Sequence, residues 1–238
     1  MLVIIFFTSI FCSWILSNSM ISILRDYLLD KPNDRSSHIN PTPSGGGLII
    51  VIIGILSSLL LKKYLILLCL PIALVGIIDD KFKLPSLFRY LIQILTVFFI
   101  MISVDFTLLD NYPLKNLCFL IFLILGTAII NFINFMDGID GIIAGCMILI
   151  LGSFAFTTDP FLVGLVGSLI GFLILNWHPA KLFMGDIGST FLGATFLIPL
   201  FSSETTYNFI DSFLITLPLS GDAIICVLRR LFNKEPIF

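Results

Sequence analysis

The sequence predicts an all-α, polytopic integral membrane protein with about nine transmembrane helices. Hydrophobic residues make up 58% of its 238 residues and charged residues only 12%, too few to cover the surface of a water-soluble domain. Apolar runs recur along the whole chain, and a helix needs about 20 residues to cross a hydrocarbon core about 30 Å thick. No long polar segment is left for a soluble domain, so we expect residues 1–238 to form a single transmembrane domain.

The first expected helices flank a long polar loop. The run from about Leu2 to Leu24 is too long for the apolar part of a signal peptide and has no clear cleavage site, so it predicts a membrane helix. The loop Arg25–Gly47 contains three prolines and ends in three glycines, which interrupt helical structure. Two short apolar runs separated by a pair of lysines, Leu48–Leu61 and Tyr64–Ile78, predict two short helices joined by a tight turn.

Further apolar runs complete the expected helices. These runs are Leu87–Val104, Asn116–Met136, Ile142–Phe156, Phe161–Leu175, Thr190–Phe201 and Phe209–Leu228. The most polar connection between them is 176–189, which reads NWHPAKLFMGDIGS. Gly185 and Gly188 flank Asp186, so we expect a tight turn there, with Ser189 capping the helix that follows.

The basic residues are distributed unevenly between the two sides of the predicted bundle. If each helix crosses once, all but three of the 13 lysines and arginines lie on the side that carries the polar motifs. The exceptions are Lys62, Lys63 and Lys115. Because basic residues favour the cytoplasmic side, we expect the motif face to be cytoplasmic and the N-terminus to lie outside.

Acidic residues gather at the expected helix ends on this same face. They are Asp79, Asp80, Asp137, Asp140 and Asp186. Two adjacent carboxylates repel each other unless they share a cation. Asn131 and Asn134 precede Asp137 at three-residue spacing, so these three side chains are expected along one helix face. The alternative interpretation is purely structural: the polar residues only cap loops or pack helices.

The combination of charges on this face indicates phosphoryl chemistry. Mg²⁺ prefers oxygen ligands and is usually held by one or two carboxylates together with substrate phosphates. Nearby basic residues, which include Lys81, Lys83 and Lys181, suit phosphate oxygens. A metal-binding and phosphate-binding site at the lipid boundary predicts transfer between a soluble nucleotide and a membrane-bound acceptor. A transporter is the less favoured alternative, because the acids lie at helix ends and not near the middle of the bilayer.

Four segments in this order resemble one enzyme family over about residues 38–230. They read HINPTPSGGG, GIIDDKFKLPS, NFINFMDGIDG and NWHPAKLFMGDIGSTFLG. Together they resemble the polyprenyl-phosphate N-acetylhexosamine-1-phosphate transferases of glycosyltransferase family 4. The resemblance implies transfer of the sugar phosphate from a UDP-N-acetylhexosamine to undecaprenyl phosphate, with Mg²⁺, or Mn²⁺ as an alternative, and with release of UMP.

The resemblance also implies a setting for the reaction. The form HPAKLFMGD is most similar to members that start O-antigen or related surface glycans, which implies the bacterial cytoplasmic (inner) membrane. No nucleic-acid partner is expected, and the sequence leaves open whether the chain forms a homodimer.

Matched position by position, the resemblance implies roles for individual residues. Asp186 would bind the metal, and Asp79 and Asp80 would act on the attacking lipid phosphate as base or orienting group. The substrate-binding positions would be His38, Lys83, Asn134, Asp137, Asp140 and Asn176. Family members continue past their RRLF-type sequence into a loop with a His-x-His or similar motif, whereas this sequence ends at Phe238. The shorter C-terminus leaves a second alternative, a catalytically impaired member that binds a lipid or a partner.

Overall fold

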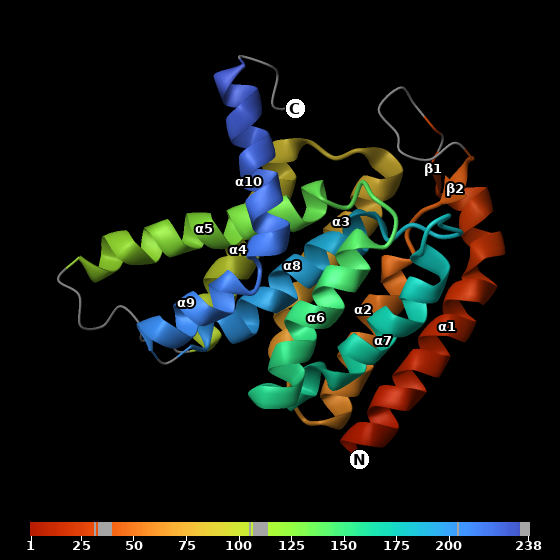
Figure 1. The fold of residues 1–238 in the computed structure, drawn as a ribbon, viewed down its shortest axis with the longest axis horizontal. Coiled ribbons are helices and arrows are strands. Elements are labelled where there is room, and N and C mark those ends of the chain that lie inside the picture. Colours follow the sequence, from red (N-terminus) through yellow and green to blue (C-terminus); the bar gives the residue numbers. More distant parts are fainter. Residues whose placement is uncertain (31, 33–39, 105, 107–113, 204, 234–238) are drawn as a thin grey trace.

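A computed structural model describes residues 1–30, 32, 40–104, 106, 114–203 and 205–233 (Figure 1). Within these residues the chain is a bundle of helices, which confirms the predicted all-α class. One small antiparallel sheet pairs β1 (Leu29–Asp30) with β2 (Thr42–Pro43), and it lies between the first two helices in the sequence.

The helices differ from the predicted runs mainly at their ends. They are α1 (Leu2–Tyr27), α2 (Gly47–Leu60), the 3₁₀ turn η1 (Leu65–Cys69), α3 (Leu70–Phe82), α4 (Ser86–Ser103), α5 (Lys115–Phe135), α6 (Ile142–Thr157), the 3₁₀ turn η3 (Pro160–Leu162), α7 (Val163–Asn176), α8 (Gly185–Phe201), α9 (Thr206–Leu214) and α10 (Leu217–Phe232). Among the described helices, α1, α4 and α5 are long and apolar enough to cross a membrane. The number of spans and the side on which each loop lies stay predictions.

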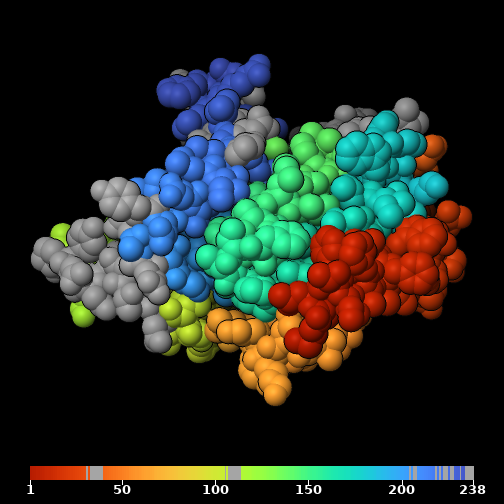
Figure 2. Space-filling view, turned by 60° about the horizontal axis from the view of Figure 1, so that its bottom comes forward, coloured from red at the N-terminus to blue at the C-terminus, as the bar shows by residue number. Residues whose placement is uncertain are grey.

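The predicted ninth helix, Phe209–Leu228, is wrong as a single element. This region forms two helices, α9 and α10, with the break at Ile215 and Thr216. Pro218 is the second residue of α10, where its missing N–H removes no helical hydrogen bond, whereas it would interrupt a helix that continued through it. α10 then projects from the rest of the bundle, as both views show (Figures 1 and 2).

α8 begins earlier than predicted and changes the role expected of Ser189. Its first residue, Gly185, has φ of +75°, a left-handed conformation that glycine adopts without steric cost. Ser189 lies within the helix and is therefore not its N-terminal cap. Its Oγ donates to the carbonyl oxygen of Gly185 at 3.1 Å. The expected tight turn at Gly185 is present, but Asp186 belongs to the first turn of the helix.

α8 is the central helix of the bundle. Every residue from Ile187 to Phe201 is buried. Its neighbours approach at glycines: a Cβ on Gly76 of α3 would lie 2.5 Å from the Cα of Ile187, and one on Gly47 of α2 would lie 2.4 Å from the Cα of Gly188. This close packing fixes the beginning of α8 against the end of α3 and the beginning of α2.

α1 packs along α7 at one side of the bundle (Figures 1 and 2). A Cβ on Gly171 of α7 would lie 2.2 Å from the carbonyl oxygen of Ile10 in α1. The Oγ of Ser13 in α1 donates to the carbonyl oxygen of Ser168 at 2.7 Å. Small residues let the two backbones approach closely, as is common between membrane helices.

Candidate active site

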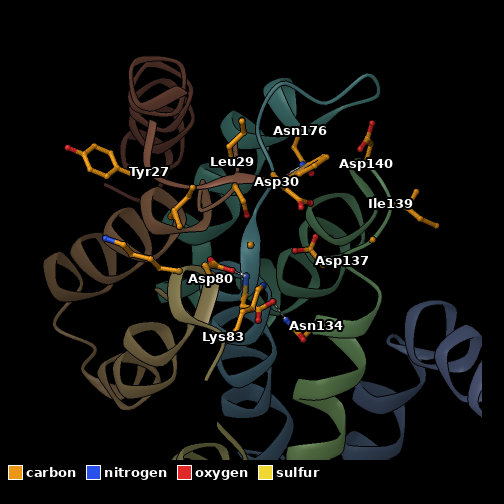
Figure 3. A pocket seen from close by; sticks show the side chains of 17 residues that line it. Tyr27, Leu29, Asp30, Asp80, Lys83, Asn134, Asp137, Ile139, Asp140 and Asn176 are labelled. Carbon is orange, nitrogen blue, oxygen red and sulfur yellow. Dashed lines mark hydrogen bonds between the residues drawn. The ribbon is translucent and has the colours of Figure 1, made fainter. Parts of the chain in front are cut away.

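A cavity of about 590 Å³ opens at the end of the bundle where α8 begins. Residues that the sequence separates widely line it, and Figure 3 shows several of them facing one space from different elements. The predicted site residues on its wall are Asp80, Lys83, Asn134, Asp137, Asp140, Asn176 and Asp186. His38 lies outside the described residues. The structure therefore brings seven of the nine predicted site residues to one cavity, and the remaining described one, Asp79, lies behind it.

Asp186 is the centre of the hydrogen-bond network. Its Oδ1 accepts from Nδ2 of Asn134 at 2.9 Å, and its Oδ2 lies 3.6 Å from Nη1 of Arg89. Its backbone N–H donates to Oδ1 of Asp80 at 2.9 Å. Nδ2 of Asn134 also donates to Oγ of Ser189 at 2.9 Å. Three of the sequence motifs, carried by α3, α5 and α8, are thus joined through one carboxylate and its neighbours.

The adjacent acids Asp79 and Asp80 point in different directions. Asp80 lines the large cavity. Asp79 is buried, with 2% of its surface exposed, and lines a smaller cavity behind the first. Its Oδ1 accepts from the N–H of Leu84 at 2.6 Å, and its Oδ2 accepts from Nη1 of Arg89 at 2.7 Å. Successive helical residues point about 100° apart, so one acid faces the cavity and the other faces the helices.

The donor groups of the cavity fit a divalent cation. Among the described residues, Oδ2 of Asp80 is buried and has no hydrogen-bond partner. Burial, and to a smaller extent the nearby carboxylates of Asp186 and Asp80, raises the pKa of Asp137 well above its usual value. No three His, Cys, Asp or Glu side chains within the described ranges are grouped to hold a metal by themselves. Mg²⁺ commonly takes only one or two carboxylates, which Asp80 and Asp186 can supply.

Asn176 and Asp140 tie two loops together beside the cavity. Asn176 is buried; its Oδ1 accepts from the N–H of Gly141 at 3.1 Å, and its Nδ2 donates to the carbonyl oxygen of Leu182 at 3.0 Å. Oδ2 of Asp140 lies 2.8 Å from Nδ1 of His178. These contacts hold the connection between α5 and α6 against the connection between α7 and α8.

A further prediction concerns the asparagines and the aspartate at the end of α5. The expectation that Asn131, Asn134 and Asp137 share one helix face is wrong for Asp137, whereas Asn131 and Asn134 both lie on α5 and line the smaller cavity. α5 ends at Phe135, so Asp137 lies in the following turn. Asn131 instead exchanges hydrogen bonds with Gln93 of α4, its Nδ2 donating to Oε1 at 2.7 Å.

Lys83 ends α3 with a left-handed backbone, φ +51°, and lines the cavity. This conformation is uncommon for a residue with a Cβ, and such strain often occurs at functional sites.

The structure adds residues that sequence reasoning missed. Asp30 of β1 and Ser44, which directly follows β2, line the cavity, and Arg89 of α4 contacts both Asp79 and Asp186. Ser44 carries a weak sequence signal, because it directly precedes three glycines. Arg89 carries none, because it lies in the apolar run of the next helix and meets Asp186 only after folding.

Comparisons with known proteins agree with the site. Residues 63–203 match the family model of glycosyl transferase family 4. A probable undecaprenyl-phosphate N-acetylglucosaminyl 1-phosphate transferase of Bacillus subtilis is 30% identical, over 88% of this chain and 66% of that protein. A phospho-N-acetylmuramoyl-pentapeptide-transferase of Oceanobacillus iheyensis is 31% identical, over 64% of this chain and 58% of that protein. A protein of the same description from Wolbachia pipientis is 30% identical, over 80% of this chain and 71% of that protein.

The chain spans less than two thirds of the length of the first two of these relatives, 66% and 58% respectively. The matched residues 63–203 include the ends of α3, α5 and α7 and the beginning of α8, which form most of the cavity wall.

Proposed function

This chain belongs to glycosyl transferase family 4, and we propose that it transfers an N-acetylhexosamine-1-phosphate from a UDP-sugar to undecaprenyl phosphate, releasing UMP. The family membership confirms the resemblance carried by the four sequence motifs. The observation that carries the proposal is the contact network of Asp186 with Asn134 and Asp80, which joins three of those motifs at one cavity.

The proposed reaction exchanges one phosphoanhydride (P–O–P) linkage for another. A phosphate oxygen of the lipid attacks the β-phosphorus of the UDP-sugar and forms a new P–O bond. The bond between that phosphorus and the bridging oxygen breaks, and the electron pair leaves with UMP. A Mg²⁺ held by Asp186 would supply positive charge to the diphosphate.

The residues of the chain supply position and charge. Within the described part of the chain, Asp80 has a buried oxygen without a hydrogen-bond partner, which supports its assignment to orient the lipid phosphate or to accept its proton. Asp186, oriented by Asn134, is the proposed metal ligand together with Asp80. Lys83 lines the same cavity and is the proposed cation for the diphosphate oxygens. Asp140, held beside His178, is proposed to contact the nucleotide.

The membrane orientation and the type of glycan are proposed from the sequence. The motif face is proposed to be cytoplasmic, with the N-terminus outside, because all but three of the 13 basic residues fall on that face. The form HPAKLFMGD supports a role at the start of O-antigen or a related surface glycan. The relatives include proteins described as acting on N-acetylglucosamine and on N-acetylmuramoyl-pentapeptide, so the sugar is a separate variable in the test.

The experiment is an assay of UMP release by the purified chain in nanodiscs that contain undecaprenyl phosphate. UDP-N-acetylglucosamine, UDP-N-acetylgalactosamine and UDP-N-acetylmuramoyl-pentapeptide are compared, each with Mg²⁺ and with a chelator. We expect UMP release with one UDP-N-acetylhexosamine, dependent on both the lipid and the cation. Binding of the lipid with no UMP release from any donor would favour the alternative of a lipid-binding protein without turnover.

A further inference from the structure

Arg89 stands between two acids of the candidate active site but does not face the large cavity. Its Nη1 lies 2.7 Å from Oδ2 of Asp79 and 3.6 Å from Oδ2 of Asp186. It lines the small cavity behind the site together with Asp79, Asp186, Gln93 and Asn131. Among the described residues, its Nε is buried without a hydrogen-bond partner, and its Nη1 contacts both acids. Neither the family motifs nor the cavity wall assigns it a role.

The two contacts differ in strength. The Asp79 carboxylate is 4% exposed and also accepts from the N–H of Leu84, so both of its oxygens are occupied. Asp79 therefore anchors Arg89 and has no free oxygen for a substrate. The contact with Asp186 is longer; the Asp186 side chain is 30% exposed and lines the large cavity, and the Arg89 side chain is 38% exposed. The guanidinium therefore shares its positive charge between Asp79 and Asp186, the proposed metal ligand.

We infer that Arg89 is the internal counter-ion of Asp186: it neutralises that carboxylate from behind and weakens cation binding until the diphosphate of the nucleotide-sugar arrives. This inference rests on the proposed function and deepens it. Asn134 occupies one oxygen of Asp186 and Arg89 lies at the other, so the nucleotide-free site binds a divalent cation weakly. The added negative charge of a diphosphate makes the cation favourable. Arg89 is a positioning residue, because it lines the small cavity and acts through Asp186, which lines the large one.

The test measures cation binding without nucleotide, so that it does not depend on turnover. Mn²⁺ is titrated into the purified full chain in detergent, and free Mn²⁺ is followed by electron paramagnetic resonance. Removal of one positive charge a few ångströms from the site strengthens cation binding, so we expect Arg89→Gln to bind Mn²⁺ at least about tenfold more tightly than the original chain. Arg89→Lys keeps the charge and should stay within about threefold of the original chain, a range that a change of charge would exceed.

Two controls locate the effect. Asp186→Asn in the Arg89→Gln background should abolish the gained Mn²⁺ binding, because it removes the carboxylate that Arg89 had neutralised. Arg89→Met is a second charge-removing variant for use if Arg89→Gln does not fold, and folding is checked by size-exclusion chromatography. Unchanged Mn²⁺ affinity in a folded charge-removing variant, or an equal gain in Arg89→Lys, would overturn the inference. A purely structural role of Arg89 predicts lower stability and no gain in Mn²⁺ affinity.

The outcome separates the inference from the proposed function. If the original chain releases no UMP from any donor, the transferase assignment fails, but the Mn²⁺ comparison still decides whether Arg89 acts as a counter-ion. If the original chain is active and the Mn²⁺ affinities are equal, only the counter-ion inference fails.

Discussion

At the scale of single residues, the site depends on which way each carboxylate faces. Asp186 has a partner at each oxygen, and both oxygens of Asp79 accept hydrogen bonds. Asp80 has one buried oxygen that accepts no hydrogen bond from the residues that the structure describes. The three carboxylates therefore differ in whether an oxygen is available to bind a ligand. These differences lead to two residue-level predictions.

Asp186→Asn is expected to lower the rate of UMP release at least about a hundredfold, which is the scale for loss of a principal electrostatic stabiliser. Asparagine keeps the size of the side chain but removes the charge that binds a cation. The measurement is UMP release in membranes at equal protein level. Asp211→Asn is the matched control, because Asp211 is an exposed acid in α9, outside the large cavity. Near-normal release by Asp186→Asn would contradict its assignment as metal ligand.

Asp79→Asn and Asp80→Asn are expected to have different effects. Asp80→Asn should lower kcat far more than it changes KM, with little loss of thermal stability, because an asparagine oxygen can still accept from the N–H of Asp186. Asp79→Asn should lower the melting temperature, because loss of the buried charged partner of Arg89 costs about 1–3 kcal/mol. The measurements are steady-state kinetics and thermal unfolding of both variants. Identical profiles would rule out this division of labour.

At the scale of helices, close approach of backbones positions the site. α8 begins in the centre of the bundle because glycines of α2 and α3 leave room for its first turn. α7 carries glycines where it meets α1, whereas Gly145 of α6 has open space around it. Glycine therefore allows close packing of α7 against α1, whereas Gly145 of α6 has no such packing role.

Gly171→Ala is expected to destabilise the protein, and Gly145→Ala is its matched control. A Cβ at Gly171 would lie 2.2 Å from the carbonyl oxygen of Ile10, so the helices must move apart, at a cost of about 1–3 kcal/mol. Beyond its own helix turn, no atom of the described residues lies within 4 Å of a Cβ at Gly145, where alanine should be neutral or stabilising by up to about 1 kcal/mol. Thermal unfolding in detergent distinguishes the two. Equal melting temperatures would show that the α1–α7 contact is looser than described.

At the scale of the whole molecule, the connections that form the cavity gather at one end of the bundle. The ends of α3, α5 and α7 meet the beginning of α8 there. α6 and α8 run from this end toward the region of Thr158 and Thr205, which lies at the other end. Orientation in the membrane therefore decides whether the cavity can receive a cytoplasmic nucleotide.

Cysteine labelling in intact cells is expected to show that the cavity face is cytoplasmic. In a background without the five native cysteines, Lys181→Cys should be protected from a membrane-impermeant thiol reagent, and Thr205→Cys should react. Both residues are exposed and lie in connections between helices. Labelling after permeabilisation is the control for accessibility. The reverse pattern would reject the orientation and the cytoplasmic site together.

The sequence by itself determined the helical class, the membrane setting and the candidate residues, because hydrophobic runs and motif spacing are local signals. It also predicted that Asp79 and Asp80 differ, because neighbouring helical residues point apart. Only the tertiary structure decided which acid faces the cavity, that Asn131 pairs with Gln93, and that Arg89 meets Asp186.

The reason is the distance along the chain between the groups that meet. The contact of Asp80 with the N–H of Asp186 joins residues 106 positions apart, and that of Asn134 with Asp186 spans 52 positions. Such pairs depend on how α3, α5 and α8 pack, which no local pattern records. The early start of α8 has the same origin, because its first turn forms where Gly47 and Gly76 leave space for it.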